Sequence, residues 1–156
     1  MQIPKSLSGD GRLYFDDLMI GQRFATAPYQ LTAGDIVSFA RRYDPQGFHL
    51  DNEEAENSLF AGLAASGWHT AAISMRLLVE SGPKLVGGLV GAGGELNWPR
   101  PTRPGDTLHV ETEVLETVPS RSKPDRGMVT VRNTTLNQNG EAVQTFVVKL
   151  VVPRRM

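Results

Sequence analysis

The sequence predicts an α+β fold in which an antiparallel β-sheet wraps around one long central α-helix. After Ser66 and Gly67, the run WHTAAISMRLLVES is apolar around almost its whole circumference, a pattern typical of a buried helix. From Gly87 onward, four segments rich in valine and threonine follow one another, which indicates an antiparallel meander. Residues 1–156 contain no repeat or linker, so we expect them to form a single domain.

The strands are predicted from β-branched segments bounded by turns. Residues 1–21 are mostly polar or turn-forming, and a first strand is expected within residues 22–31. The sequence NQNG is a strong hairpin signal, because Asn139 and Gly140 tolerate a positive φ. The strand-like segments after the helix are GGLVGAGGELNW, DTLHVETEVLE, GMVTVRNTTL and EAVQTFVVKLVV.

Two shorter helices are expected before the central one. Thr32 is placed to cap a helix whose fourth position is Asp35, in the manner of a capping box. This helix should end at about Tyr43, because Pro45 disfavours a helical conformation in the residue before it. A second helix is expected over residues 51–57, where acidic side chains in the first turn interact favourably with the helix dipole.

The composition excludes several classes of function. Hydrophobic residues make up 40% of the chain and charged residues 21%, with a formal net charge of −1, so neither nucleic acid nor an anionic membrane is an expected partner. Without cysteine there is no disulfide or thiol nucleophile, and with three histidines we expect no metal site. The N-terminal MQIPKSLSGD lacks the regions of a signal peptide, and we expect a cytoplasmic protein.

The stretch YDPQGFHLD holds the first candidate site residues. Asp44 and His49 lie five positions apart with a proline and a glycine between them, so the backbone bends and both side chains can face one cavity. A carboxylate and an imidazole are the commonest acid and base groups near neutral pH. The alternative is structural: Asp44 caps a turn and His49 bonds a backbone carbonyl. The residues alone leave both readings open.

Ser66 and Gly67 form the second candidate feature. At the start of the central helix, the Gly67 amide would be a free donor, and the missing side chain would let a ligand carbonyl approach. Such a donor stabilises an oxyanion. The alternative is that Ser66 only caps the helix and that Gly67 only permits close packing.

Taken together, these segments resemble the MaoC-like dehydratases, the R-specific enoyl-CoA hydratase group of the hot-dog fold. The resemblance extends from about Phe15 to Val152 and rests on YDPQGFHLD, LFAGLAASGWHTAA, ELNWPRPTRPGDTL, RSKPDRG and NQNGEAV in that order. Asp44 and His49 match the family's catalytic motif in type and spacing. Gly67 falls at the position of its oxyanion glycine.

The resemblance implies syn hydration of a trans-2-enoyl-CoA, or the reverse dehydration of an (R)-3-hydroxyacyl-CoA, without a cofactor. Asp44 and His49 would activate the water and return a proton, and the Gly67 amide would polarise the thioester carbonyl. Two departures from the family's pattern, Gln46-Gly47 and Ser66-Gly67, lie in the pocket and bear on the substrate class. The residues expected to bind substrate are Gln46, Phe48, Ser66 and Trp68.

The remaining polar and aromatic residues are secondary candidates. His69 is expected in the core and His109 at the surface or an interface, while Trp68 and Trp98 suit a core or an interface better than a stacking platform for adenine. Basic residues in two loops are candidates for contacts with the phosphates of coenzyme A, against the alternative of simple solvation. They are Arg100, Arg103, Arg121, Lys123 and Arg126.

Two alternative functions remain. A hot-dog thioesterase would need a carboxylate on or near the central helix, but the first acid in that helix is Glu80, at its far end. A non-catalytic protein that binds acyl thioesters would be expected to lack Asp44 or His49, and both are present. Because a single sheet around one helix leaves its edges open, we expect a homodimer or a higher homo-oligomer with acyl tunnels near the interface.

Overall fold

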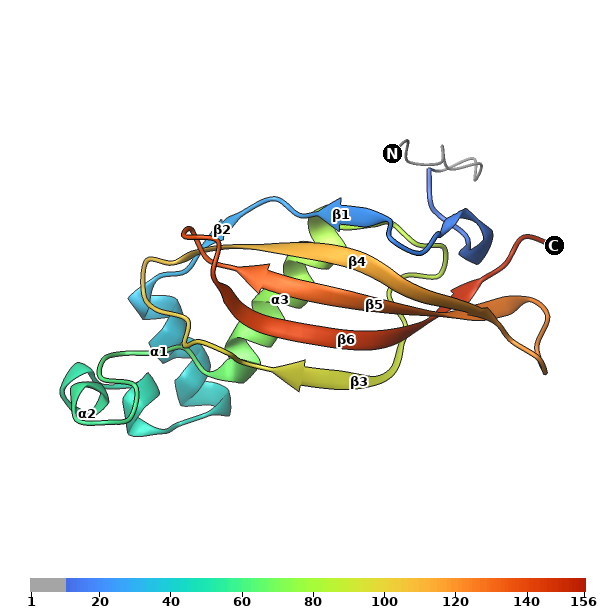
Figure 1. The fold of residues 1–156 in the computed structure, drawn as a ribbon. Coiled ribbons are helices and arrows are strands. Elements are labelled where there is room, and N and C mark those ends of the chain that lie inside the picture. The colour runs from blue at the N-terminus through green and yellow to red at the C-terminus, as the bar shows by residue number, and fades with distance from the viewer. Residues whose placement is uncertain (1–10) are drawn as a thin grey trace.

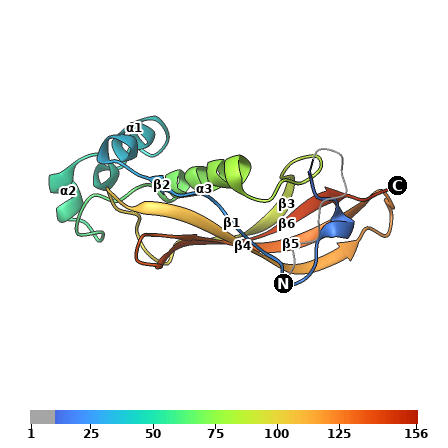
Figure 2. The same ribbon diagram turned by 90° about the horizontal axis from the view of Figure 1, so that it is seen from above.

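One face of an antiparallel sheet carries a single long helix, and two short helices lie beyond one end of the sheet (Figures 1 and 2). The computed structural model describes residues 11–156. The strands are β1 (Arg23–Ala25), β2 (Tyr29–Gln30), β3 (Gly91–Asn97), β4 (Thr107–Pro119), β5 (Arg126–Leu136) and β6 (Ala142–Pro153). The helices are α1 (Ala33–Tyr43), α2 (Asn52–Glu56) and α3 (Gly67–Ser81), with 3₁₀ turns η1 (Phe15–Asp17) and η2 (Gly47–His49). The predicted α+β arrangement is confirmed.

The two short helices begin and end at the residues that the sequence indicates. The Thr32 side chain accepts a hydrogen bond from the Asp35 amide at 3.1 Å, and the Asp35 carboxylate reaches back to the Thr32 amide, which completes a capping box. Asp44 ends α1 in a non-helical conformation. Asp51 caps α2 by accepting from the Glu54 amide at 3.0 Å. These caps place the YDPQGFHLD stretch between two helices of fixed length.

The prediction that α3 is buried on all sides is wrong for one of its faces. Thr70 and Ser74 face the sheet, where the Ser74 hydroxyl lies 2.6 Å from the hydroxyl of Thr135 on β5. Trp68 and Met75, on the flank of the helix, are 62% and 43% exposed. The sheet covers only one side of the helix, and no described element covers the other. An apolar stripe therefore remains at the surface, formed by Trp68, Ala72, Met75 and Val79.

The strand order also differs from a simple meander. Strands β4, β5 and β6 are consecutive neighbours, but β3 pairs with β6 instead of β4, so the order is β1-β4-β5-β6-β3. The chain reaches β4 from β3 through the proline-rich segment 98–106, which crosses the start of α3, where Thr70 donates to the Thr102 hydroxyl at 3.0 Å. The expected first strand is two strands, β1 and β2, because Pro28 between them has no amide hydrogen for the ladder.

The N-terminal segment contributes more to the core than its polar composition suggests. Leu13, Phe15 and Leu18 are buried against strands β4, β5 and β6 at the end of the sheet away from α1. Residues 1–10, on which the expectation about a signal peptide rests, lie outside the described residues. No helix within residues 11–156 has the length and apolar character needed to cross a membrane. The predicted hairpin is present, with Gly140 at φ 73°.

Candidate active site

Asp44 lies at the end of α1 and points its carboxylate at His49. The Asp44 Oδ2 atom is 3.2 Å from His49 Nε2, and Oδ1 accepts a hydrogen bond from the side-chain amide of Gln46 at 2.6 Å. Partial burial acts to raise the pKa of Asp44, but hydrogen bonds from Gln46 and Ser66 and the nearby His49 outweigh it, so the pKa lies below its usual value. Asp44 is therefore ionised at neutral pH.

His49 is buried in η2, and its other ring nitrogen has a partner. Nδ1 donates to the Ala64 carbonyl, 2.6 Å away, because a carbonyl only accepts. Nε2 then faces the Asp44 carboxylate, which also only accepts while it is ionised. Because these atoms lie 3.2 Å apart, a proton held by either residue faces an acceptor on the other, and the two form a candidate acid–base pair.

The Gly67 amide lies at the first position of α3, beside this pair. No described residue accepts a hydrogen bond from it, as expected for the first amide of a helix. A Cβ atom at this position would lie 2.6 to 2.8 Å from the indole of Trp98. The glycine is thus required by packing against Trp98, and it leaves a free donor at the positive end of the helix dipole.

These groups line one pocket of about 280 Å³. Its walls combine the end of α1, η2, the start of α3 and the segment after β3. Ser66 is fully buried next to this pocket, and its hydroxyl has no hydrogen bond of good geometry within residues 11–156, although it is close enough to Asp44 to lower the pKa. The lining residues are Asp44, His49, Phe60, Ala65, Gly67, Trp68, Thr70, Trp98, Pro99, Arg100, Pro101 and Thr102.

Arg103 fixes the loop that carries the acceptor of His49. Its guanidinium donates to the carbonyls of Gly62 at 2.8 Å, Leu63 at 3.3 Å and Phe60. Within this loop Ala61 has a φ of 51°, an uncommon conformation for a residue with a side chain. Arg103 therefore holds a strained loop in place, and the next carbonyl along, that of Ala64, orients His49.

The structure brings most of the predicted site residues together. Gln46, Ser66 and Trp68 surround the Asp44–His49 pair or line its pocket. Phe48 instead packs its ring against His49, at 4.6 Å between ring centroids, and against Phe60. Of the basic residues, Arg100 lines the pocket and pairs with Glu141 at 3.0 Å, while Arg103 is occupied by the loop.

The other three basic residues lie elsewhere. Arg121, Lys123 and Arg126 belong to the β4–β5 turn and its flank, at the end of the sheet opposite α1 and α2 (Figure 1). Arg126 pairs there with Asp125. Within one chain they do not reach the pocket, so any contact of theirs with a ligand in such a pocket would require a second copy of the chain.

The remaining histidines do not enter the pocket. His69 is buried as expected, with its ring stacked on Phe39 at 4.5 Å, but its Nδ1 atom has no partner among the described residues. Burial lowers the pKa of His69, with Asp35 acting in the opposite direction. His109 is partly exposed and lies 3.3 Å from Glu111. Residues 11–156 contain no group of three or more acidic, histidine or cysteine side chains placed to hold a metal ion.

Sequence reasoning did not find three parts of this region. The loop contacts of Arg103, the packing of Trp98 on Gly67 and the acceptor role of Ala64 all join segments that are distant in the chain. The proline-rich run WPRPTRPGD signals an extended loop that returns to the helix start. That signal locates the loop, but it does not specify which arginine faces inward.

Comparison with known proteins identifies the family. The MaoC like domain matches residues 17–138. A 3-hydroxybutyryl-CoA dehydratase of Methylorubrum extorquens is 33% identical over 113 residues, covering 71% of this chain and 69% of that protein. The crystal structure of the MaoC-like dehydratase from Rhodospirillum rubrum is 59% identical, with a TM-score of 0.91 over 92% of this chain and 99% of that one. The unliganded R-hydratase of Pseudomonas aeruginosa is 26% identical, with a TM-score of 0.70 over 92% and 88%.

Proposed function

The chain belongs to the MaoC-like dehydratases of the hot-dog fold, and from this premise we propose that it catalyses the reversible syn hydration of a trans-2-enoyl-CoA to an (R)-3-hydroxyacyl-CoA. The observation that carries the proposal is a single pocket that holds the Asp44–His49 pair and the free Gly67 amide. The 3-hydroxybutyryl-CoA dehydratase and the R-hydratase among its relatives support this reaction and this stereochemistry.

Asp44 and His49 can accept and donate the two protons that the addition of water requires. With Asp44 ionised and His49 protonated, a water molecule at the pair gives one proton to Asp44 while its oxygen bonds to the β-carbon. His49 delivers its Nε2 proton to the α-carbon, so the double bond is consumed and no charge remains. Both transfers come from the same face of the substrate, which makes the addition syn. Proton transfer from Asp44 to His49, across 3.2 Å, restores the starting state.

The Gly67 amide supplies the electrostatic part of the reaction. A thioester carbonyl that accepts a hydrogen bond from this amide is polarised, and the enolate that forms when water adds to the β-carbon places its negative charge on that oxygen. The start of α3 adds the positive end of the helix dipole at the same point. Dehydration uses the same groups in reverse. The reaction moves water and protons only, so it requires no cofactor beyond the coenzyme A of the substrate.

A thioesterase is the second candidate, and the carboxylate positions disfavour it. Glu80, the first acid of α3, lies at the far end of the helix and pairs with Arg76 at 2.8 Å on the exposed face. Asp44 lies near Gly67, but it is paired with His49 at 3.2 Å instead of standing alone against a carbonyl. A non-catalytic binding protein would not need this acid–base pair.

We further propose that the protein acts as a cytoplasmic homodimer. The edge strand β3 has only one neighbour among the described strands, β6, and most of its residues are exposed. The apolar stripe on α3, which includes Trp68, Met75 and Val79, is exposed as well. Two-fold pairing of β3 edges would extend the sheet and cover apolar surface in both copies. Sedimentation at micromolar concentration tests this, and an active monomer would contradict it.

The function is tested by a screen of purified protein against enoyl-CoAs of graded chain length and branching. Hydration removes the conjugated enoyl absorbance without releasing a thiol, whereas a thioesterase releases free coenzyme A. We expect loss of the enoyl absorbance with no thiol, and an (R)-3-hydroxyacyl product by chiral chromatography. Thiol release without hydration would assign the thioesterase function instead, and neither signal with any substrate would overturn the proposal.

A further inference from the structure

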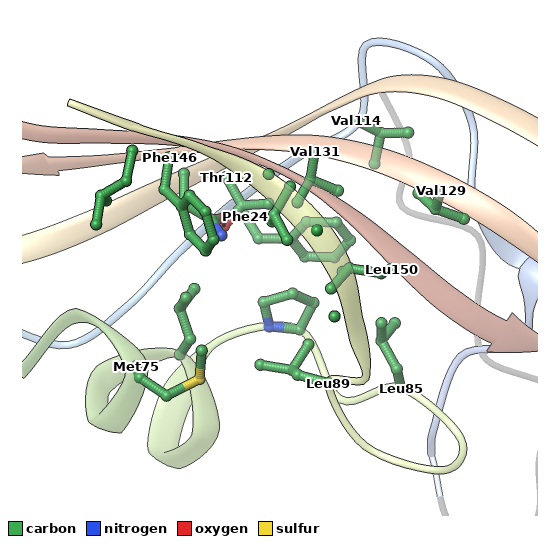
Figure 3. Close-up of a pocket in the computed structure, with 18 of the residues that line it drawn as sticks. Phe24, Met75, Leu85, Leu89, Thr112, Val114, Val129, Val131, Phe146 and Leu150 are labelled. Carbon is green, nitrogen blue, oxygen red and sulfur yellow. Dashed lines mark hydrogen bonds between the residues drawn. The ribbon is translucent and has the colours of Figure 1, made fainter. Parts of the chain in front are cut away.

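A second and larger space lies beyond Trp68. It measures about 420 Å³ and is bounded by α3, the inner face of the sheet and the segment that follows α3. In Figure 3, Val114, Val131 and Leu150 project from the sheet toward Met75 on α3 and Leu89 on the opposite wall. No charged side chain of the described residues lines this space. Trp68 lines both spaces, so this apolar cavity adjoins the pocket that holds the Gly67 amide.

The cavity wall contains one polar pair. Thr112 on β4 and Asn133 on β5 are direct partners in the antiparallel register, and both are at least nine-tenths buried. The Thr112 hydroxyl donates to Asn133 Oδ1 at 2.7 Å. Apart from the indole nitrogen of Trp68, the side chains of these two residues are the only polar ones among the described residues that line the cavity.

This hydrogen bond uses the carbonyl oxygen of the Asn133 side chain and leaves its NH₂ group available as a donor. Its Oδ1 is occupied by Thr112, and no residue within 11–156 accepts a hydrogen bond from its Nδ2. A donor that faces an apolar cavity without a partner is unfavourable, whereas aliphatic side chains of similar shape would carry no such cost. Pockets for small molecules commonly use a few such polar groups in an apolar wall to select and orient their ligand.

We propose that Asn133, oriented by Thr112, is a recognition point for a neutral oxygen atom on the acyl chain, such as a keto, hydroxyl or ether group. This inference rests on the proposed function, because it takes the cavity as the acyl site of the same enzyme. A free carboxylate does not fit, since its charge would be buried without a cation. An unsubstituted chain fills the cavity but leaves the amide unsatisfied.

The position of the pair places this oxygen well beyond the reacting double bond. Ser74 lies seven residues after Gly67, roughly 10 Å along the helix. Its hydroxyl contacts Thr135, and Asn133 follows on the same face of β5, about 7 Å from Thr135. The recognised oxygen therefore belongs to the middle or distal part of the chain, and the chemistry at the thioester end remains as described above.

The test compares binding of two sets of saturated acyl-CoAs, which cannot be hydrated. One is an unsubstituted medium-length chain, and the other carries a single keto oxygen moved carbon by carbon along the same chain. At the best position we expect the keto chain to bind the wild type about tenfold more tightly than the plain chain, by calorimetry. Asn133→Leu, which keeps the volume, should abolish this preference. Thr134→Val, on the outer face of the same strand, should leave it unchanged.

Several outcomes would overturn the inference. Equal binding of plain and keto chains by the wild type at every position, or an unchanged preference in Asn133→Leu, would assign the pair to sheet stability alone. Failure to bind any acyl-CoA would do so as well. If Asn133→Leu does not fold, Thr112→Val should weaken the preference by freeing the amide to rotate, and an unchanged preference there counts against the inference. Hydration of enoyl-CoAs is measured separately, so a keto preference without hydration would reject the proposed reaction and retain the subsite.

Discussion

Two spaces lie against α3, and Trp68 borders both of them. In the smaller pocket, Asp44, His49 and Gly67 come from short stretches of chain close to helix ends, and the first two have fixed hydrogen-bond partners. In the larger cavity the walls come from α3, five strands of the sheet and the segment after α3, and the Thr112–Asn133 pair stands among apolar side chains. The polar groups of the smaller pocket are therefore positioned by local contacts, whereas the larger apolar space is shaped by long-range strand pairing.

The largest difference between the two spaces is expected when Asp44 or His49 is replaced. Asp44→Asn and His49→Gln should each lower turnover by about 10²-fold or more, because each removes a positioned proton carrier. Binding of a saturated acyl-CoA should change by less than about twofold, since the cavity is untouched. Steady-state hydration and calorimetry on the same preparations measure both effects. Near-normal turnover in either variant would contradict the proposed mechanism, in which both residues carry protons.

A second variant tests whether the donor and its packing can be separated. In Gly67→Ala, the new Cβ forces the Trp98 indole to move, because the two would otherwise lie within 2.8 Å. We expect turnover to fall by about tenfold or more as the carbonyl loses its approach to the amide. In the double variant Gly67→Ala with Trp98→Leu, the smaller side chain at position 98 leaves room for the alanine Cβ, but position 67 still carries a side chain.

The double variant discriminates between the two roles of Gly67. If the glycine serves only to accommodate Trp98, the double variant should match Trp98→Leu alone in turnover and melting temperature, since that single variant already lacks the hydrogen bond to Gln144. If the approach of the carbonyl to the amide matters, the melting temperatures should match while turnover of the double variant remains lower. Turnover equal to that of Trp98→Leu alone would remove the Gly67 amide from the proposed mechanism.

Loosening the loop should have an intermediate effect confined to the smaller pocket. Arg103→Met removes all three hydrogen bonds to the loop carbonyls. We expect about tenfold lower kcat/KM and roughly 1 to 3 kcal/mol lower stability, because partly buried carbonyls lose their donors. Arg103→Lys should rescue only part of this, since an ammonium lacks the planar fork of a guanidinium.

Two measurements distinguish a role of Arg103 in orienting His49 from a purely structural role. The pH profile of kcat/KM should shift in Arg103→Met, because a displaced Ala64 carbonyl no longer holds the Nδ1 proton of His49. Arg121→Met, in the turn at the far end of the sheet, is the matched control and should leave the profile unchanged. A lower melting temperature with an unaltered pH profile would make Arg103 a purely structural residue.

The smallest effect, on stability, is expected for Asp35→Asn at the start of α1, the helix that ends at Asp44. Hydrogen bonds to Asp35 from Thr32 lower the pKa of Asp35 below its ordinary value of 3.8. The ionised carboxylate therefore stabilises the folded state above that value, and the contribution is lost as the pH falls through the lower, folded pKa. Asp35→Asn should cost about 0.5 to 1 kcal/mol at pH 7 and almost nothing in strong acid. A gap in melting temperature that is independent of pH would contradict this.

Much of the smaller pocket could be predicted because its signals are local. Thr32 and Asp35 define the start of α1, Pro45 its end, and the spacing from Asp44 to His49 follows from the bent segment between them. The family resemblance added the roles of these residues. Capping and proline effects act over a few residues, so a sequence displays them directly.

The larger cavity could not be predicted for the opposite reason. Thr112 and Asn133 lie opposite each other because of the β4–β5 register, and β3 reaches the cavity only by pairing with β6 across the sheet. The expected meander placed β3 beside β4. The exposed face of α3 was missed for a similar reason, since an all-apolar helix pattern does not reveal which faces the sheet of the same chain covers.

The position of the aromatic residues has a spectroscopic consequence. The chain contains two tryptophans, and both border the smaller pocket, edge to face with ring centroids 5.3 Å apart. Trp98 donates to Gln144 on β6, and Trp68 also lines the larger cavity. No tryptophan elsewhere contributes a background signal. The intrinsic fluorescence of the unlabelled protein therefore reports occupancy of the site, and a change in emission on mixing would time the arrival of a ligand.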